Sequence, residues 1–267
     1  CNTFEKEFLM LLEQRLEFID SLPPLPSILQ PRSFAATDKE NIPAHDPAKP
    51  AASILPGTID AYFTGISQQT IDDVDLCKLV MQNSANKKFP EDDQLFDWYL
   101  HYVNGLSNLG WVFQNRDIQE RTINRIGLTM DAVALDIARS LIGKDAALAL
   151  SLIAGKALEG VKEDQRMIEL FSKGSDLGKH AKFDIAPVWL DNGGAPNMIL
   201  NCISLDAQES KKGILFWKST RQSTTVKTGA VRAALSLTTF AGHRQALREK
   251  YHAAAKQYIS QLPDLDF

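Results

Sequence analysis

The spacing of apolar residues changes along the chain and divides it into three parts. From Phe4 to Ile19 they recur at helical spacing, which predicts an amphipathic N-terminal helix over residues 1–22. Eight of the twelve prolines then fall between Pro23 and Pro56. We therefore expect residues 23–56 to form a Pro-rich strap or linker, because such a composition favours extended backbone. Residues 57–267 are predicted to form a single domain.

Within this domain the helical period gives way to the period of strands. Four stretches have the apolar spacing of helices: residues 71–88, 91–114, 122–143 and 145–164. Three later stretches alternate as strands do and are separated by polar turns: residues 182–190, 197–205 and 214–228. A last helix is expected over residues 240–262. The pattern predicts an α+β fold, with a predominantly helical N-terminal two-thirds packed on a small antiparallel sheet formed by the C-terminal third, and a closing helix.

Composition and charge exclude several classes of protein. The chain is 44% hydrophobic and 23% charged, which is typical of a globular domain. Its net charge of −4 and its scattered basic residues argue against a nucleic-acid partner. Three cysteines without paired spacing favour a reducing compartment over a disulfide framework. The charged N-terminal stretch lacks the apolar centre of a signal peptide, and no apolar run is long enough for a membrane span.

Sequence motifs of catalysis and of metal binding are not found. The segment "GSDLGKH" differs from a phosphate-binding loop, because three residues instead of four separate its glycines and His180 follows the lysine. The five histidines are far apart, and none forms an i, i+4 pair that could bind zinc. We therefore assign no catalytic residue and no metal ligand from motifs.

Cys202 is the most informative residue, because it lies in the middle of the apolar segment "NMILNCISL". In a strand it would share a face with Met198 and Leu200. Three interpretations remain open. The thiol could be a small buried apolar group, or a nucleophile assisted by a distant His180 or His243. It could also carry an acyl chain as a thioester.

The helical first two-thirds, the late hairpin strands and "NMILNCISL" resemble the Erwinia virulence factor family, small bacterial proteins that promote persistence in the insect gut. The resemblance implies a palmitate joined to Cys202 by a thioester. It also implies a non-enzymatic virulence or host-persistence factor, with the fatty acyl group and a membrane surface or host component as partners. We would then expect the protein in the bacterial cytoplasm, associated with a membrane, or released without a signal peptide.

The acyl chain would need an apolar pocket beside Cys202. If the small-faced helices after residue 128 cover the sheet, we expect the pocket to be lined by Met198, Leu200, Leu135, Ile142, Leu148 and Ile153. The alternative packing leaves no cavity there. Two other functions also remain open: a cysteine-dependent acyltransferase or hydrolase-like enzyme that uses Cys202, and a plain interaction module.

Overall fold

The computed structural model describes residues 2–26, 45–123, 126–177, 180–206, 218 and 224–266, with some residues, Cys202 among them, described by backbone alone. The helices are α1 (Asn2–Ser21), α2 (Gln68–Lys88), α3 (Leu95–Asn108), α4 (Met130–Arg139), α5 (Lys144–Glu163), α6 (Gln165–Ser175), α7 (Leu237–Ala241) and α8 (Arg244–Ala255). The strands are β1 (Ala51–Leu55), β2 (Thr58–Tyr62), β3 (Trp111–Ile123), β4 (Asp176–Leu177), β5 (His180–Leu190), β6 (Pro196–Asp206), β7 (Thr224–Leu235) and β8 (Ser260–Leu262).

The described strands form one eight-stranded sheet. Its order is β3-β7-β6-β5-β2-β1-β8, and β4 pairs with β5 outside this path. The neighbours are antiparallel, except that β2 and β5 run parallel. The predicted α+β class is confirmed, and β5 and β6 contain the predicted strands at 182–190 and 197–205.

The sheet is larger than predicted and mixed, because its first three strands come from the N-terminal half. β1 lies inside the stretch predicted as a strap, and it forms a tight hairpin with β2 through Pro56 and Gly57. Gly57 has a φ of 68°, which suits glycine in such a turn. β3 begins inside the predicted helix 91–114, after Gly110 (φ 95°) has ended α3. Gly110 thus ends a helix although the apolar spacing alone continues.

The C-terminal part also differs in detail from the prediction. The described part of the predicted strand 214–228 is Lys218 and the beginning of β7, which continues to Leu235. The closing helix is divided into α7 and α8 and is followed by the short strand β8. β8 pairs with β1 and so extends the sheet at that edge.

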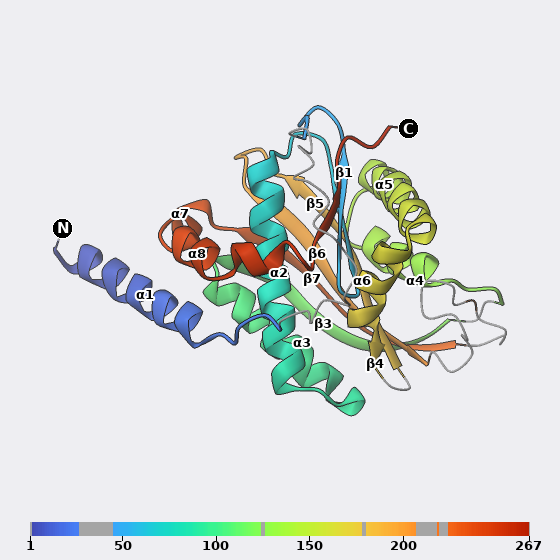
Figure 1. Ribbon diagram of the computed structural model, residues 1–267, viewed down its shortest axis with the longest axis horizontal. Helices are drawn as coiled ribbons and strands as arrows, with labels where there is room; N and C mark the ends of the chain where they lie inside the picture. Colours follow the sequence, from blue (N-terminus) through green and yellow to red (C-terminus); the bar gives the residue numbers. More distant parts are fainter. Residues whose placement is uncertain are drawn as a thin grey trace, which may run out of the picture.

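Helices cover both faces of the sheet (Figure 1). On one face lie α2 and α3, together with α7 and α8; on the other lie α4, α5 and α6. α1 extends away from the body of the molecule and is held at its C-terminal end, where Ile19 is buried. There the Lys250 ammonium donates to the backbone oxygens of Ile19 (2.8 Å) and Asp20 (2.7 Å). Carbonyl groups in the last turn of a helix suit a cation, and that of Ile19 also accepts from the backbone N–H of Leu22 (3.2 Å).

Two glycines test this packing. A Cβ atom added to Gly229 in β7 would lie 2.9 Å from the Tyr99 ring of α3, whereas one added to Gly155 in α5 meets no atom within 4 Å. We expect Gly229→Ala to lower the free energy of unfolding by about 1–3 kcal/mol through overpacking. Gly155→Ala should raise it by roughly 0.5–1 kcal/mol, because alanine favours the helix. Urea denaturation measures both, and equal effects would contradict the described packing of α3.

Candidate functional site

Cys202 lies near the middle of β6, which has β7 on one side and β5 on the other. Its backbone pairs with Gly229 of β7. The side chain of Cys202 is outside the described part of the structure, so its surroundings are taken from its neighbours. Leu200, two residues earlier, is buried and lines a pocket under α3. Alternation along a strand puts positions 200 and 202 on the same face of the sheet.

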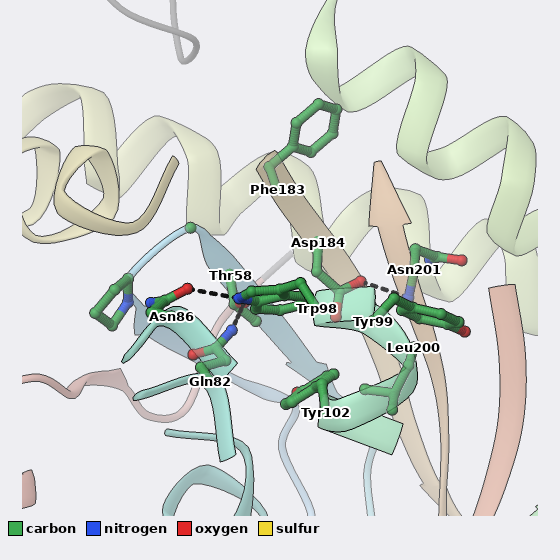
Figure 2. Close-up of a pocket in the computed structure, with 12 residues that line it drawn as sticks. Thr58, Gln82, Asn86, Trp98, Tyr99, Tyr102, Phe183, Asp184, Leu200 and Asn201 are labelled. Atoms are coloured by element: carbon green, nitrogen blue, oxygen red, sulfur yellow. Dashed lines mark hydrogen bonds between the residues drawn. The ribbon is translucent and has the colours of Figure 1, made fainter. Parts of the chain in front are cut away.

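The pocket under α3 lies between that helix, α2, the start of β2 and the middle parts of β5 and β6 (Figure 2). It is lined by Pro56, Gly57, Thr58, Gln82, Asn86, Trp98, Tyr99, Tyr102, Phe183, Asp184, Leu200 and Asn201. The aromatic rings from α3 fill much of it, and the remaining cavity is about 30 Å³. That volume is enough for about one water molecule.

Hydrogen bonds hold the polar walls of this pocket in place. The Trp98 indole donates to Asn86 Oδ1 (2.7 Å), and Gln82 Nε2 donates to Thr58 Oγ1 (2.6 Å). Gln82 Oε1 and Asn201 Oδ1 are buried acceptors that have no hydrogen-bond partner among the described residues. The pocket therefore suits a small hydrogen-bond donor beside its aromatic wall.

A buried ion cluster adjoins the pocket. Lys78 of α2 donates to Asp60 of β2 and to Asp184 Oδ2 of β5 (3.2 Å), and its ammonium is fully buried. Burial alone lowers the pKa of Lys78, but the two carboxylates raise it above its ordinary value. Asp184 Oδ1 also accepts from the backbone N–H of Asn201 (3.0 Å). The ion cluster thus joins α2 to β2, β5 and β6.

Asp75, three residues before Lys78, forms a second buried contact of α2 with the sheet. Its carboxyl accepts hydrogen bonds from Tyr62 Oη, Ser53 Oγ (2.7 Å) and Gln261 Nε2 (3.1 Å). Burial, together with the nearby charge of Asp60, raises the pKa of Asp75 to about 7. The Lys78 ion cluster and the Asp75 carboxyl are both shielded from solvent, so we interpret them as contacts that attach α2 to the sheet.

The structure separates the six residues predicted to line an acyl pocket. Met198 and Leu200 are buried in β6, and Leu200 faces α3. The other four, Leu135, Ile142, Leu148 and Ile153, belong to α4, α5 and the turn between them, on the opposite face of the sheet. Leu148 is moreover 64% exposed. The prediction considered one helical layer, whereas α2 and α3 form another that covers Leu200.

The groups considered for cysteine chemistry belong to separate parts of the fold. His243 is buried at the start of α8 against the Phe240 ring, and burial lowers its pKa. The backbone of His180 pairs with Asp206, which is four residues and roughly 13 Å along β6 from Cys202. Cys77 is buried in α2, where burial raises the pKa of its thiol. Cys1 lies outside the described residues.

The described residues offer neither a metal site nor a membrane-spanning helix. Among the described residues, no group of three or more His, Cys, Asp and Glu side chains is arranged to hold a metal ion. No helix in the described ranges has the length and apolar character that crossing a membrane requires.

The ion cluster predicts a large loss of stability when its cation is removed. Lys78→Met leaves Asp60 and Asp184 buried without a counter-charge, so we expect the free energy of unfolding to fall by about 3–5 kcal/mol. Lys49→Met removes an exposed pair with Asp266 and should change little. Urea denaturation of both variants is the measurement, and similar small effects would show that Lys78 is not the cation on which these carboxylates depend.

The raised pKa of Asp75 predicts that the free energy of unfolding depends on pH. The unfolded chain loses this proton near pH 4, whereas the folded protein keeps it to about pH 7, so unfolding releases a proton in this window. Stability should therefore fall as the pH rises, by up to about 1.4 kcal/mol per pH unit from this group. Asp75→Asn should show a smaller decline, and Asp97→Asn, at an exposed position of α3, should follow the wild type. Parallel curves for wild type and Asp75→Asn would contradict this.

Comparisons with known proteins give only distant similarity. No protein family model matches the sequence, and no curated protein matches it. A solved structure of the Evf virulence factor is 13% identical, with a TM-score of 0.34, over 77% of this chain and 84% of that one. A delta-endotoxin structure is 12% identical, also with a TM-score of 0.34, over 80% of this chain and 91% of that one. Similarity at this level does not assign the chain to a family.

Proposed function

We propose that the protein is an S-acylated bacterial host-interaction factor that carries palmitate as a thioester on Cys202 and acts by binding, without catalysis. The observation that supports this most directly is the place of Cys202 in β6. Its backbone follows Leu200 and Asn201, both of which line the pocket under α3. This modification is the one that the sequence resemblance implies.

The surroundings of position 202 suit a thioester because they exclude water. Strands lie on both sides of β6, and the neighbouring Leu200, Asn201 and Ile203 are buried. A thioester there would be protected from hydrolysis. Each methylene that the chain buries adds up to roughly 0.8 kcal/mol.

The cavity, at about 30 Å³, is much smaller than a long acyl chain. In this proposal the acyl chain therefore enters by moving the rings of Tyr99 and Tyr102 away from the sheet. α3 would then lie further from β6 in the acylated protein than in the structure described above. The chain either stays in this widened layer or swings out to a membrane surface.

The other cysteines are poorer candidates. The Cys77 thiol is fully buried, and its raised pKa keeps it protonated and unreactive. The alternative function, a cysteine-dependent acyltransferase or hydrolase, requires a base near Cys202. The His180 backbone is too far along the sheet, and His243 belongs to the helix layer near α1.

The test is the intact mass of the protein purified from a bacterial host. We expect an added palmitoyl group that neutral hydroxylamine removes, since this reagent cleaves thioesters. Cys202→Ser should abolish the added mass and keep the fold, whereas Cys77→Ala should retain the added mass.

Three outcomes would contradict the proposal. The wild type could lack a hydroxylamine-labile group, or the group could disappear only in Cys77→Ala. The third is an unmodified Cys202 that reacts rapidly with thiol reagents at neutral pH, which would favour the enzyme.

A further inference from the structure

A second, larger cleft lies on the other side of the molecule from the α3 pocket. It has a volume of about 490 Å³, within the range of 300–1,000 Å³ that small-molecule sites occupy. Its walls come from the ends of the parallel strands β2 and β5, from β7, and from the turn between α4 and α5. Most of the lining is apolar, including Phe63, Leu141, Ile142, Trp189 and Leu190.

Arg232 of β7 is the charged residue in this lining. Its guanidinium lies over the Trp189 ring, 5.2 Å from the centroid, and Nη2 donates a long hydrogen bond to Asn197 Oδ1 (3.4 Å). Within the described ranges, Arg232 forms no ion pair with a carboxylate. Stacking therefore holds a planar group with five N–H donors at the edge of the cleft.

Asp191 is an acidic residue on which the charge of Arg232 acts. Its carboxylate accepts hydrogen bonds from the backbone N–H groups of Gly193 (2.8 Å) and Ala195 (2.9 Å), which close the turn between β5 and β6. These hydrogen bonds lower the pKa of Asp191, and the charge of Arg232 lowers it further by a smaller amount. The Asp191 carboxylate is thus engaged in the turn between β5 and β6, and the Arg232 guanidinium remains available for a ligand.

The start of α5 adds a second feature that favours an anion. Gly143 is the N-cap of this 20-residue helix and makes no side-chain cap, and both Gly143 and Ala146 line the cleft. The unpaired N–H groups of a first helical turn attract negative charge. Asp145 stands in the same first turn, and the charge of Arg232 acts on Asp191, so the surroundings favour a single negative charge over a doubly charged phosphate.

We propose that this cleft binds a single-chain apolar carboxylate, such as a medium-chain fatty acid. Its carboxylate pairs with Arg232, and its chain lies against Phe63, Ile142 and Leu190. The proposal is independent of acylation at Cys202, because the cleft faces the α4–α5 layer and Leu200 faces α3.

Calorimetric titration with dodecanoate, below the concentration at which it forms micelles, tests the proposal. We expect binding of one dodecanoate per chain, and binding at least tenfold weaker for dodecyltrimethylammonium, which has the same chain and the opposite charge. Arg232→Gln should weaken dodecanoate binding by about tenfold or more, the effect of losing a charge-assisted hydrogen bond. Lys156→Gln, at an exposed position of α5 outside the cleft lining, should bind as the wild type does.

Ala146→Phe provides a second variant, because it fills the cleft and keeps Arg232; it should also reduce binding. The same titration on Cys202→Ser should be unchanged, which distinguishes this site from the acylation proposal. Equal binding of the two detergents, or full binding by both cleft variants, would overturn the inference. So would binding to phosphatidylcholine vesicles without binding of monomeric dodecanoate, since it would assign the cleft to a membrane surface.

Discussion

The position of α2 depends on one buried ammonium group. Lys78 holds Asp60 and Asp184, which belong to β2 and β5, the parallel pair in an otherwise antiparallel sheet. Buried ions are costly to remove from water, and their mutual attraction offsets this cost only when the geometry is good. An ionic contact at this point specifies which strands lie under α2 more narrowly than apolar packing would. The α3 pocket depends on it, since Asp184 also fixes the backbone of Asn201.

The two helical layers give the faces of the sheet different properties. Under α2 and α3 the sheet is covered by aromatic rings and buried polar groups, and little space remains. On the other face, the turn between α4 and α5 leaves an open cleft beside Trp189 and Arg232. The two proposed ligands, the acyl chain on Cys202 and the free carboxylate, therefore differ in the conformational change that they require. The first requires the protein to make room, whereas the second uses room that already exists.

The sequence predicted the α+β class and the strands on either side of the "DNGGAP" turn, because alternation and turn residues agree there. It did not predict β1, which lies within a Pro-rich segment whose composition favours irregular backbone, or β3, which follows a segment of helical spacing that only Gly110 ends. The ion cluster was missed, although Asp75 and Lys78 stand among Val74, Leu76 and Leu79 on a largely buried helix, which is a usable signal. Asp60 and Asp184 could not be paired with Lys78 without the strand order. For the same reason, the sequence did not indicate that α3 covers the face of the sheet on which Leu200 lies.

The edge strand β8 has a consequence for how the protein is made. β1 is synthesised long before β8, which completes its outer edge, and Gln261 of β8 donates a hydrogen bond to Asp75, 186 residues earlier. Contacts of such long range slow folding, and an uncovered strand edge can pair with another chain in the meantime. During translation, the outer edge of β1 therefore lacks its partner strand until nearly all of the described chain has left the ribosome.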